Sequence, residues 1–319
     1  MTNSFNFIDL FAGIGGFHYA LDKIGGECVF VSEWDDVPAK LYELNHGMKP
    51  HGDITTVKAS DIPAHDLIAA GFPCQAFSIS GKQNGFSDPR GTLFFDIMRI
   101  AEYHRPKVLF LENVRNFAQH DNGKTILTVK NTMEKHGYHF YGKLFSASDF
   151  GVPQARERFI MVGLREDIDP NRSFMFPEGS KKLVSVNDIL EKGADVSEYV
   201  INRKDITMDL TKLSSKKQNK TLRIGSVSAG RQGERIYDPN GHAITLSAFG
   251  GGVGAKTGLY YINGKVRKLT PRECARVQGF PDSFILPQSK NAAWQVFGNS
   301  VPVPLISAVA QSLRDQKFI

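Results

Sequence analysis

The chain has 319 residues, enough for one large domain or two modest ones with a sizeable buried core. Hydrophobic residues make up 41% and charged residues 23%, and the 30 glycines and 15 prolines show no repeat period, which excludes disordered, collagen-like and coiled-coil chains. No apolar run approaches the roughly 18 residues of a membrane span, and the start of the chain lacks the basic flank of a secretion signal. We therefore expect a cytoplasmic protein that does not contact a membrane.

The cysteines and the charges indicate which kinds of site and partner the protein has. Cys28, Cys74 and Cys274 form no CxxC pair, so we expect neither a disulfide framework nor a metal site. The net charge is +6 and the isoelectric point about 9.1, which favours a polyanionic partner. Residues 179–267 contain 15 Lys and Arg against 8 Asp and Glu, so the positive charge belongs to this one segment.

The first half of the chain alternates short apolar runs with amphipathic stretches. The predicted strands are Phe5–Leu10, Cys28–Ser32, Asp66–Ala70, Val108–Leu111 and Arg158–Val162. The predicted helices between them are Gly16–Ile24, Val37–Asn45, Leu93–Tyr103 and Lys124–His136. This alternation predicts an α/β fold with an open, mostly parallel, doubly wound sheet. Ligands of such sheets bind at the carboxyl ends of the strands.

The composition changes after Pro177. The apolar periodicity weakens, and ten of the 30 glycines lie between Gly225 and Gly264, which is typical of a smaller, loop-rich domain. Helical patterns return over Pro271–Gln278 and Pro304–Leu313, and the first of them opens with proline, which helices accept at their start.

A glycine-rich turn follows the first predicted strand. Residues 11–17 read FAGIGGF, but His18 stands where a dinucleotide-binding loop has its third glycine, which favours a ligand without a pyrophosphate. S-adenosylmethionine fits, because the glycines allow close backbone approach and Glu33, 20 residues after Gly13, offers a carboxylate to a ribose. A tight turn that binds no ligand is the alternative.

Three other residues complete this predicted cofactor site. Asp53 is placed to accept from the adenine amino group, and Phe11 and Trp34 offer surfaces on which a base can stack.

Three reactive side-chain types are predicted at the same edge of the sheet. Cys74 follows the third strand in the loop GFPCQ, where the preceding proline restrains the backbone, although a lone cysteine is more often an inert small hydrophobe. Glu112 ends the next strand, and Arg156 and Arg158 enter the last one at a spacing that points to one side of an extended chain. The alternative for Glu112 is an exposed loop acid, and the alternative for the two arginines is a surface ion pair. A thiol, a carboxyl group and arginines beside a methyl donor favour attack on an electron-poor ring.

Six blocks in a fixed order extend this interpretation over nearly the whole chain: DLFAGIGGF, GFPCQAFS, ENV, QARERF, RECARVQGFP and FGNSVP. They resemble the motif series of the DNA cytosine-5 methyltransferases. Further stretches, among them QGERIY and AITLSA, are similar to a bacterial member that methylates the inner cytosine of GCGC. The resemblance implies a discontinuous catalytic and cofactor-binding domain, 1–186 with 295–319, and a mainly β target-recognition domain with a hinge, 187–294.

The resemblance also implies a role for each site residue. Cys74 would attack C6 of a flipped-out cytosine, Glu112 would act at N3, and Arg158, with Arg156 beside it, would hold O2. The implied cofactor-binding residues are Phe11, Gly13, Ile14, Gly16, Glu33, Trp34, Asp53, Ile54, Pro73, Leu93, Asn299 and Val301. The implied DNA-binding residues are Ser80, Gln232, Arg235, Thr245 and Gly252.

The expected partners are S-adenosylmethionine and double-stranded DNA. A restriction endonuclease with the same target site is expected but not as a bound subunit, and the protein is expected to be a monomer. Phe249 and Ala155 depart from the similar bacterial member, which has tyrosine and lysine there, so sequence specificity stays open. Two alternatives also stay open: methylation of cytosine in tRNA, and a non-catalytic DNA-binding protein on the same scaffold.

Overall fold

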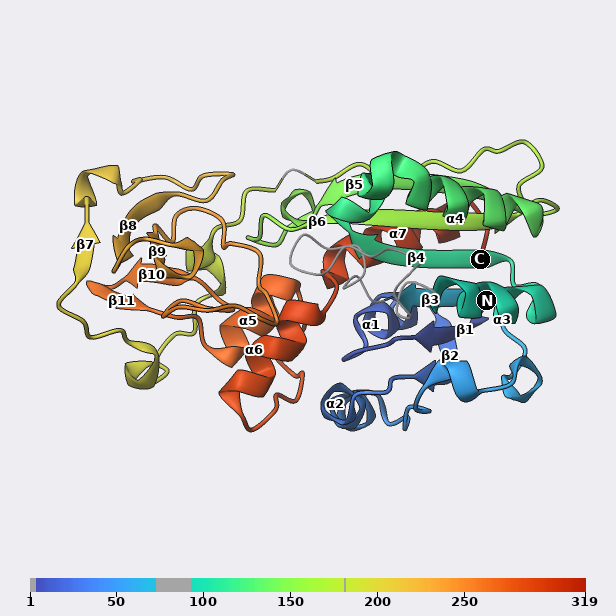
Figure 1. Ribbon diagram of the computed structural model, residues 1–319, viewed down its shortest axis with the longest axis horizontal. Helices are drawn as coiled ribbons and strands as arrows, with labels where there is room; N and C mark the ends of the chain where they lie inside the picture. The colour runs from blue at the N-terminus through green and yellow to red at the C-terminus, as the bar shows by residue number, and fades with distance from the viewer. Residues whose placement is uncertain (1–3, 73–92, 181) are drawn as a thin grey trace. The chain divides into compact units, whose positions relative to one another are not determined.

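The structure is a computed structural model that describes residues 4–72, 93–180 and 182–319 (Figure 1). Contacts divide the chain into two compact units. Unit 1 contains residues 1–145, 157–178 and 306–319, and unit 2 contains residues 146–156 and 179–305. The domain boundaries implied by the resemblance stay a prediction. The compact units differ from them in placing residues 146–156, 179–186 and 295–305 in unit 2.

A six-stranded sheet forms the centre of unit 1, with the strand order β2-β1-β3-β4-β6-β5 (Figure 1). Its strands are β1 Phe5–Leu10, β2 Gly26–Ser32, β3 Leu67–Gly71, β4 Val108–Val114, β5 Tyr138–Ser146 and β6 Glu157–Arg165. β1 pairs in parallel with β2 and β3, and β3 with β4, whereas β4 and β6 are antiparallel. The predicted α/β class with a mostly parallel sheet is confirmed. β5 was not predicted, because its mixed, half-exposed pattern lacks an apolar run.

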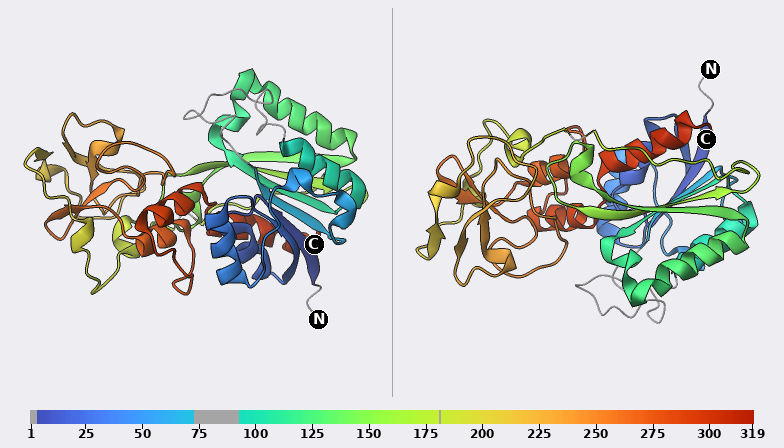
Figure 2. Two further views of the ribbon diagram at one scale, coloured as in Figure 1. Left: turned by 60° about the horizontal axis from the view of Figure 1, so that its bottom comes forward. Right: turned by 90° about the horizontal axis from the view of Figure 1, so that it is seen from above.

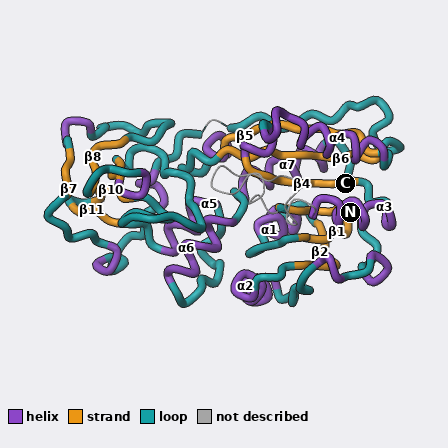
Figure 3. The backbone as a smooth tube through the Cα atoms, viewed as in Figure 1, coloured by secondary structure: helices purple, strands orange, loops and turns teal. Residues whose placement is uncertain are grey.

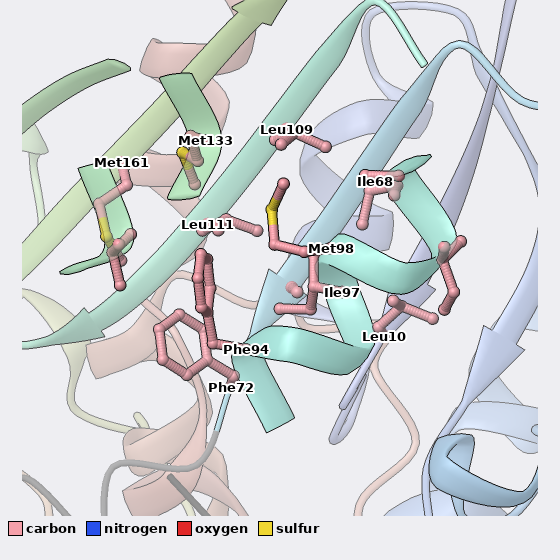
Figure 4. Packing of buried hydrophobic residues seen from close by; sticks show 14 of the residues in the cluster. Leu10, Ile68, Phe72, Phe94, Ile97, Met98, Leu109, Leu111, Met133 and Met161 are labelled. Carbon is pink, nitrogen blue, oxygen red and sulfur yellow. The ribbon is translucent and has the colours of Figure 1, made fainter. Parts of the chain in front are cut away.

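Helices cover both faces of this sheet (Figure 2). The helices of the chain are α1 Gly16–Asp22, α2 Asp36–His46, α3 Leu93–His104, α4 Lys124–Lys135, α5 Pro271–Gln278, α6 Lys290–Asn299 and α7 Val303–Asp315. On one face, Leu109 and Leu111 pack with Met98 of α3 and Met133 of α4 (Figure 4). Phe110, which alternates to the other face, meets Phe17 of α1 edge to face at 5.0 Å between ring centroids.

Unit 2 consists mostly of loops around a small sheet (Figure 3). The strands are β7 Ile206–Met208, β8 Arg223–Val227, β9 Arg235–Tyr237, β10 Leu259–Ile262 and β11 Lys265–Arg267, in the order β11-β10-β9-β8-β7. Their inner side chains form a separate apolar core that includes Ile224, Val227, Ile236 and Leu259. The predicted loop-rich, mainly β character is confirmed. Strands of three to five residues are too short to show a periodic sequence signal.

A buried ion pair joins the last strand of unit 2 to α5. Thr270 caps the helix and Glu273 accepts the backbone N–H of Thr270, which completes a capping box that the sequence Thr-Pro-Arg-Glu encodes. The same Glu273 carboxylate accepts two hydrogen bonds, of 2.7 Å each, from the Arg267 guanidinium. The side chains of Arg267 and Glu273 are 4% and 0% exposed, so each charge depends on the other for its solvation.

One helical stretch among the described residues, Lys290–Asp315, has the length and composition of a membrane span. It comprises α6 and α7, which are separated by non-helical residues, and 61% of its apolar window is buried inside the structure. This burial is what a core helix would show.

Removing one partner of the buried pair should destabilise the protein strongly. We expect Arg267→Ala to lower the free energy of unfolding by about 3 to 5 kcal/mol, because Glu273 would keep a buried charge without its partner. The double variant Arg267→Met with Glu273→Leu should lose less, since it leaves no buried charge. Urea unfolding of the three proteins measures this, and a loss below about 1 kcal/mol for Arg267→Ala would contradict the analysis.

Candidate active site

The glycine-rich turn lies at the carboxyl end of β1 and leads directly into α1. Phe11, Gly13 and Gly15 have φ values of 54°, 55° and 83°, in the left-handed region that favours glycine. The turn thus reverses the chain over a few residues and leaves Gly13 without a side chain between its backbone and solvent. Ile14, in the middle of the turn, is buried, which anchors the turn to the core of unit 1.

Glu33, just past the end of β2, holds this turn from the side. Its Oε2 accepts the backbone N–H of Gly13 at 2.8 Å, and its Oε1 accepts the N–H of Asp35 at 2.9 Å. Burial raises the pKa of the Glu33 carboxyl group above its ordinary value, while these two N–H donors pull it back down. The sequence spacing paired Gly13 with Glu33, and the structure brings the two into direct contact.

The remaining predicted cofactor residues of unit 1 lie on several elements. Trp34 is 76% exposed directly after Glu33, and the backbone N–H of Glu33 donates to His51, close to Asp53. The exposed Asp53 carboxylate caps a short 3-10 turn, Ile54–Thr56, and Ile54 is buried beneath it. Gly16 and Leu93 are the first residues of α1 and α3. Pro73 lies outside the described residues.

Glu112 and Arg158 form an ion pair where β4 and β6 meet. The Arg158 Nε lies 2.6 Å from the Glu112 Oε1, and the side chains are only 11% and 9% exposed. Glu112 is also in register with Gly71 on β3, and the buried Asn113 amide donates to the Phe72 carbonyl at 3.3 Å. The carboxylate therefore stands beside the residue from which the chain continues into the Pro-Cys motif. Cys74 and Ser80 themselves lie outside the described residues.

Arg156 occupies a different environment from Arg158. Its side chain is 1% exposed within unit 2, and its guanidinium donates to the carbonyl oxygens of Leu246, Gly298 and Ser300 at 2.7 to 3.0 Å. Two of these carbonyls flank the exposed Asn299, and Val301 follows, buried. Arg156 thus holds the backbone on both sides of a predicted cofactor residue. Because the bonds reach backbone oxygens far apart in the chain, spacing along the sequence gave no sign of them.

The predicted DNA-binding residues of unit 2 lie on two loops that touch through glycines. Gln232 begins a 3-10 turn that ends at Arg235, where β9 starts. In this turn Gly233 packs so tightly that a Cβ would come 2.1 Å from the carbonyl oxygen of Gly251, next to Gly252. The hydroxyl of Thr245, the remaining predicted residue of unit 2, donates to the Ala155 carbonyl at 2.6 Å. The contact between the two loops therefore brings the turn of Gln232 close to Gly252.

A buried polar cluster behind the glycine turn was not predicted. His18 of α1 stacks on His46 of α2 with 4.0 Å between ring centroids, and its Nδ1 lies 2.7 Å from the Tyr42 hydroxyl. Cys28 belongs to the cluster, since its Sγ lies 3.7 Å from the Tyr42 hydroxyl, and burial together with the fully buried Asp9 raises the pKa of that thiol. Burial lowers the pKa values of His18 and His46 to about 4 each and raises the pKa of Asp9 well above its ordinary value. The sequence signal for this cluster is weak: Tyr42 and His46 are four residues apart, a spacing that places both on one face of a helix.

Comparison with known proteins identifies the family. A model described as C-5 cytosine-specific DNA methylase matches residues 5–315. This chain belongs to that family. It is 52% identical over 307 residues to the Type II methyltransferase M.HhaI of Haemophilus parahaemolyticus, covering 96% of this chain and 93% of the relative. It is 40% identical to M.HpaII of Haemophilus parainfluenzae, covering 99% and 91%.

Solved structures agree with the fold of these C-5 cytosine methylases. The methyltransferase EhMeth of Entamoeba histolytica aligns with a TM-score of 0.76 at 18% identity, covering 98% of each chain. The S. pombe Dnmt2 methyltransferase aligns with a TM-score of 0.71 at 22% identity, covering 98% of this chain and 99% of that chain. As a family member, this chain is a DNA (cytosine-5) methyltransferase.

The buried histidines should make the folded methyltransferase sensitive to acid. Histidines of the unfolded chain take up protons near a pKa of 6.5, whereas His18 and His46 in the folded protein have pKa values of about 4. As the pH falls through that window, each of the two histidines lowers the free energy of unfolding by up to about 1.4 kcal/mol per pH unit. The raised pKa values of Asp9 and Glu33 act in the opposite direction.

A comparison of wild type with His18→Asn isolates the histidine contribution, because the two proteins share both carboxyl groups. We expect the unfolding free energy of the variant to fall less steeply between pH 6.5 and 4.5, measured by urea unfolding at four pH values. Parallel slopes for the two proteins would contradict the assignment.

Proposed function

We propose that the enzyme transfers a methyl group from S-adenosylmethionine to C5 of the inner cytosine of GCGC in double-stranded DNA, through a covalent bond between Cys74 and C6. The observation that carries the proposal is the Glu112–Arg158 pair, buried beside Phe72 at the same sheet edge as the Gly13–Glu33 contact. In a parallel sheet, the carboxyl ends of β1, β3 and β4 all open onto that edge.

The residues at the end of β1 and β2 fit S-adenosylmethionine. Gly13 is partly exposed and leaves its backbone accessible beside Phe11 and Ile14, and the buried Gly16 begins α1 behind it. Each Glu33 oxygen, although it accepts one N–H, keeps lone pairs for a ribose hydroxyl. Trp34 presents an exposed ring for the adenine. We assign the same ligand to the remaining predicted residues, Asp53, Ile54, Pro73, Leu93, Asn299 and Val301. When bound, S-adenosylmethionine supplies an electrophilic methyl group on a sulfonium sulfur.

The Glu112–Arg158 pair matches one edge of cytosine. N3 and O2 are neighbouring atoms on the ring, and the two side chains that would contact them are only 2.6 Å apart. Glu112 would protonate or hydrogen-bond N3, and Arg158 would hold O2 and stabilise the negative charge that develops there. Arg156, whose guanidinium bonds to the carbonyls around Asn299, would support the catalytic arginine indirectly by holding the cofactor side of the site.

The chemistry then follows from Cys74. Its thiolate adds to C6, the ring electrons move toward C5, and C5 takes the methyl group, with neutral S-adenosyl-L-homocysteine as the leaving product. Loss of the C5 proton to a base and departure of the Cys74 thiolate restore the aromatic ring, so bonds and charge balance. The thiolate must approach C6, and the methyl group C5, perpendicular to the ring, and neighbouring base pairs cover both ring faces in stacked DNA. The cytosine must therefore swing out of the duplex, and Ser80 is the residue that we assign to the gap it leaves.

Readout of the DNA is assigned to the two glycine-coupled loops of unit 2. Arg235 is suited to a guanine edge in the major groove, Gln232 to the guanine left unpaired, Gly252 to backbone contact with a base, and Thr245 to a phosphate. The excess positive charge of residues 179–267 would supply salt-dependent affinity. The similarity of the stretches QGERIY and AITLSA to a bacterial member that methylates GCGC supports the GCGC assignment.

In its host the protein is proposed to act as a monomer in the bacterial cytoplasm, where it protects GCGC sites from an endonuclease that it does not bind. The Type II methyltransferase names of its relatives support this setting.

The decisive assay measures transfer of a labelled methyl group from S-adenosylmethionine to duplex DNA with and without GCGC. We expect incorporation only into the GCGC duplex, and bisulfite sequencing of treated plasmid should place it on the inner cytosine. Preference for tRNA over the duplex would replace the DNA assignment, and the absence of any incorporation would support the non-catalytic alternative.

The nucleophile has its own test. With S-adenosylmethionine present, a GCGC duplex with 5-fluorocytosine at the target should become covalently attached to the wild-type enzyme, because after methyl transfer fluorine cannot leave C5 as a proton does. Cys74→Ser should still bind the duplex but should lose both turnover and covalent capture, as read on a denaturing gel. Turnover by this variant would move the nucleophile to another residue.

A further inference from the structure

The stacked histidine pair behind the glycine turn takes no part in the proposed chemistry. His46 is the last residue of α2, and its Nε2 lies 3.4 Å from the carbonyl oxygen of Ile14 in the turn. Its ring also fills the space beside Gly15 so closely that a Cβ on that glycine would come 2.1 Å from Nε2. His46 therefore contacts the turn at the two residues that follow Gly13.

The ring of His46 is itself held from several sides. His18 stacks on it at 4.0 Å with 27° between the ring planes, and Tyr19 and Tyr42 meet it at 4.6 and 4.5 Å between centroids. Because burial keeps His18 and His46 neutral near pH 7, the stack carries no repulsion between charges. Three neighbouring rings thus leave His46 little freedom to move away from Gly15.

Helix α2 consequently contacts both sides of the proposed cofactor site. At its beginning, Asp35 caps the helix and donates its N–H to Glu33, the proposed ribose ligand. At its end, His46 lies against Ile14 and Gly15, next to the proposed contact of Gly13 with the methyl donor. A rigid helix therefore relates the positions of the two proposed contacts.

We propose that His46 is a positioning residue for the methyl donor: its ring fixes the Ile14–Gly15 turn so that Gly13 and Glu33 are pre-arranged for binding. This inference rests on the proposed use of S-adenosylmethionine at this turn. Without the ring, the turn would have to be ordered at the moment of binding, and that cost would appear in the cofactor affinity and not in the chemistry at cytosine.

The chain offers a matched control in a second buried histidine pair. His65 precedes β3 at the amino ends of the strands, its ring lies 4.7 Å from that of His104, and burial lowers its pKa to about 4 as well. His65 is buried, whereas His46 is partly buried, and it lies at the opposite edge of the sheet from the glycine turn.

The experiment measures calorimetric binding of S-adenosylmethionine to the full chain, its KM, and kcat at saturating cofactor on a GCGC duplex. We expect His46→Ala to raise the dissociation constant and the KM about tenfold with kcat within about twofold of wild type. His46→Phe, which keeps a ring against Gly15, should restore most of the affinity. His65→Ala should lower the unfolding temperature without changing cofactor affinity.

The outcomes separate the inference from the function on which it rests. Wild-type protein that fails to bind S-adenosylmethionine would remove the proposed function. Wild-type protein that binds, with His46→Ala binding equally well, would overturn the positioning role alone. Equal losses of affinity in His46→Ala and His46→Phe, or in His46→Ala and His65→Ala, would also overturn it, because the ring contact with Gly15 would then not be the cause.

Discussion

Parallel pairing of β1, β3 and β4 is the constraint on which the site depends. Parallel strands end at the same edge of a sheet, so residues that are about 40 to 60 positions apart in the chain meet there without any long-range motif. Asn113 and Phe72 are joined at this edge by a hydrogen bond between neighbouring strands. The antiparallel β6 then brings Arg158 to Glu112 from the other side. Strand order thereby determines which side chains can share a substrate.

Burial gives the polar groups of the site their properties. Glu112 and Arg158 are almost completely buried from solvent. Their attraction is therefore screened less than at a surface, which holds the geometry of the ion pair more firmly. Glu33 carries a raised pKa and is nevertheless positioned by two N–H donors. Under the proposed function, N3 and O2 of a bound cytosine would contact this ion pair. The enzyme therefore presents its charges already oriented.

Buried, hydrogen-bonded charged side chains help to hold unit 2 together, because its apolar core is small. Arg267 and Glu273 join a strand to a capped helix, and Arg156 donates to three carbonyl oxygens, one of Leu246 and two at the end of α6. Such bonds specify loop conformation where short strands cannot. Gly233 serves the same end sterically, since only a residue without a side chain allows its turn to approach Gly251. Loops built in this way can hold base-reading side chains without a large sheet beneath them.

The sequence by itself determined the alternating elements of unit 1, the glycine turn with its Glu33 partner, and the family, because local apolar patterns and short motifs are written in consecutive residues. It also located the start of α5 at Pro271, a residue that helices accept at that position. Only the tertiary structure decided that Arg156 is buried and bonds to backbone carbonyls, whereas Arg158 pairs with Glu112. It also decided that His46 packs on Gly15. Side-chain partners distant in the chain depend on how strands and helices pack, and no local pattern records that packing.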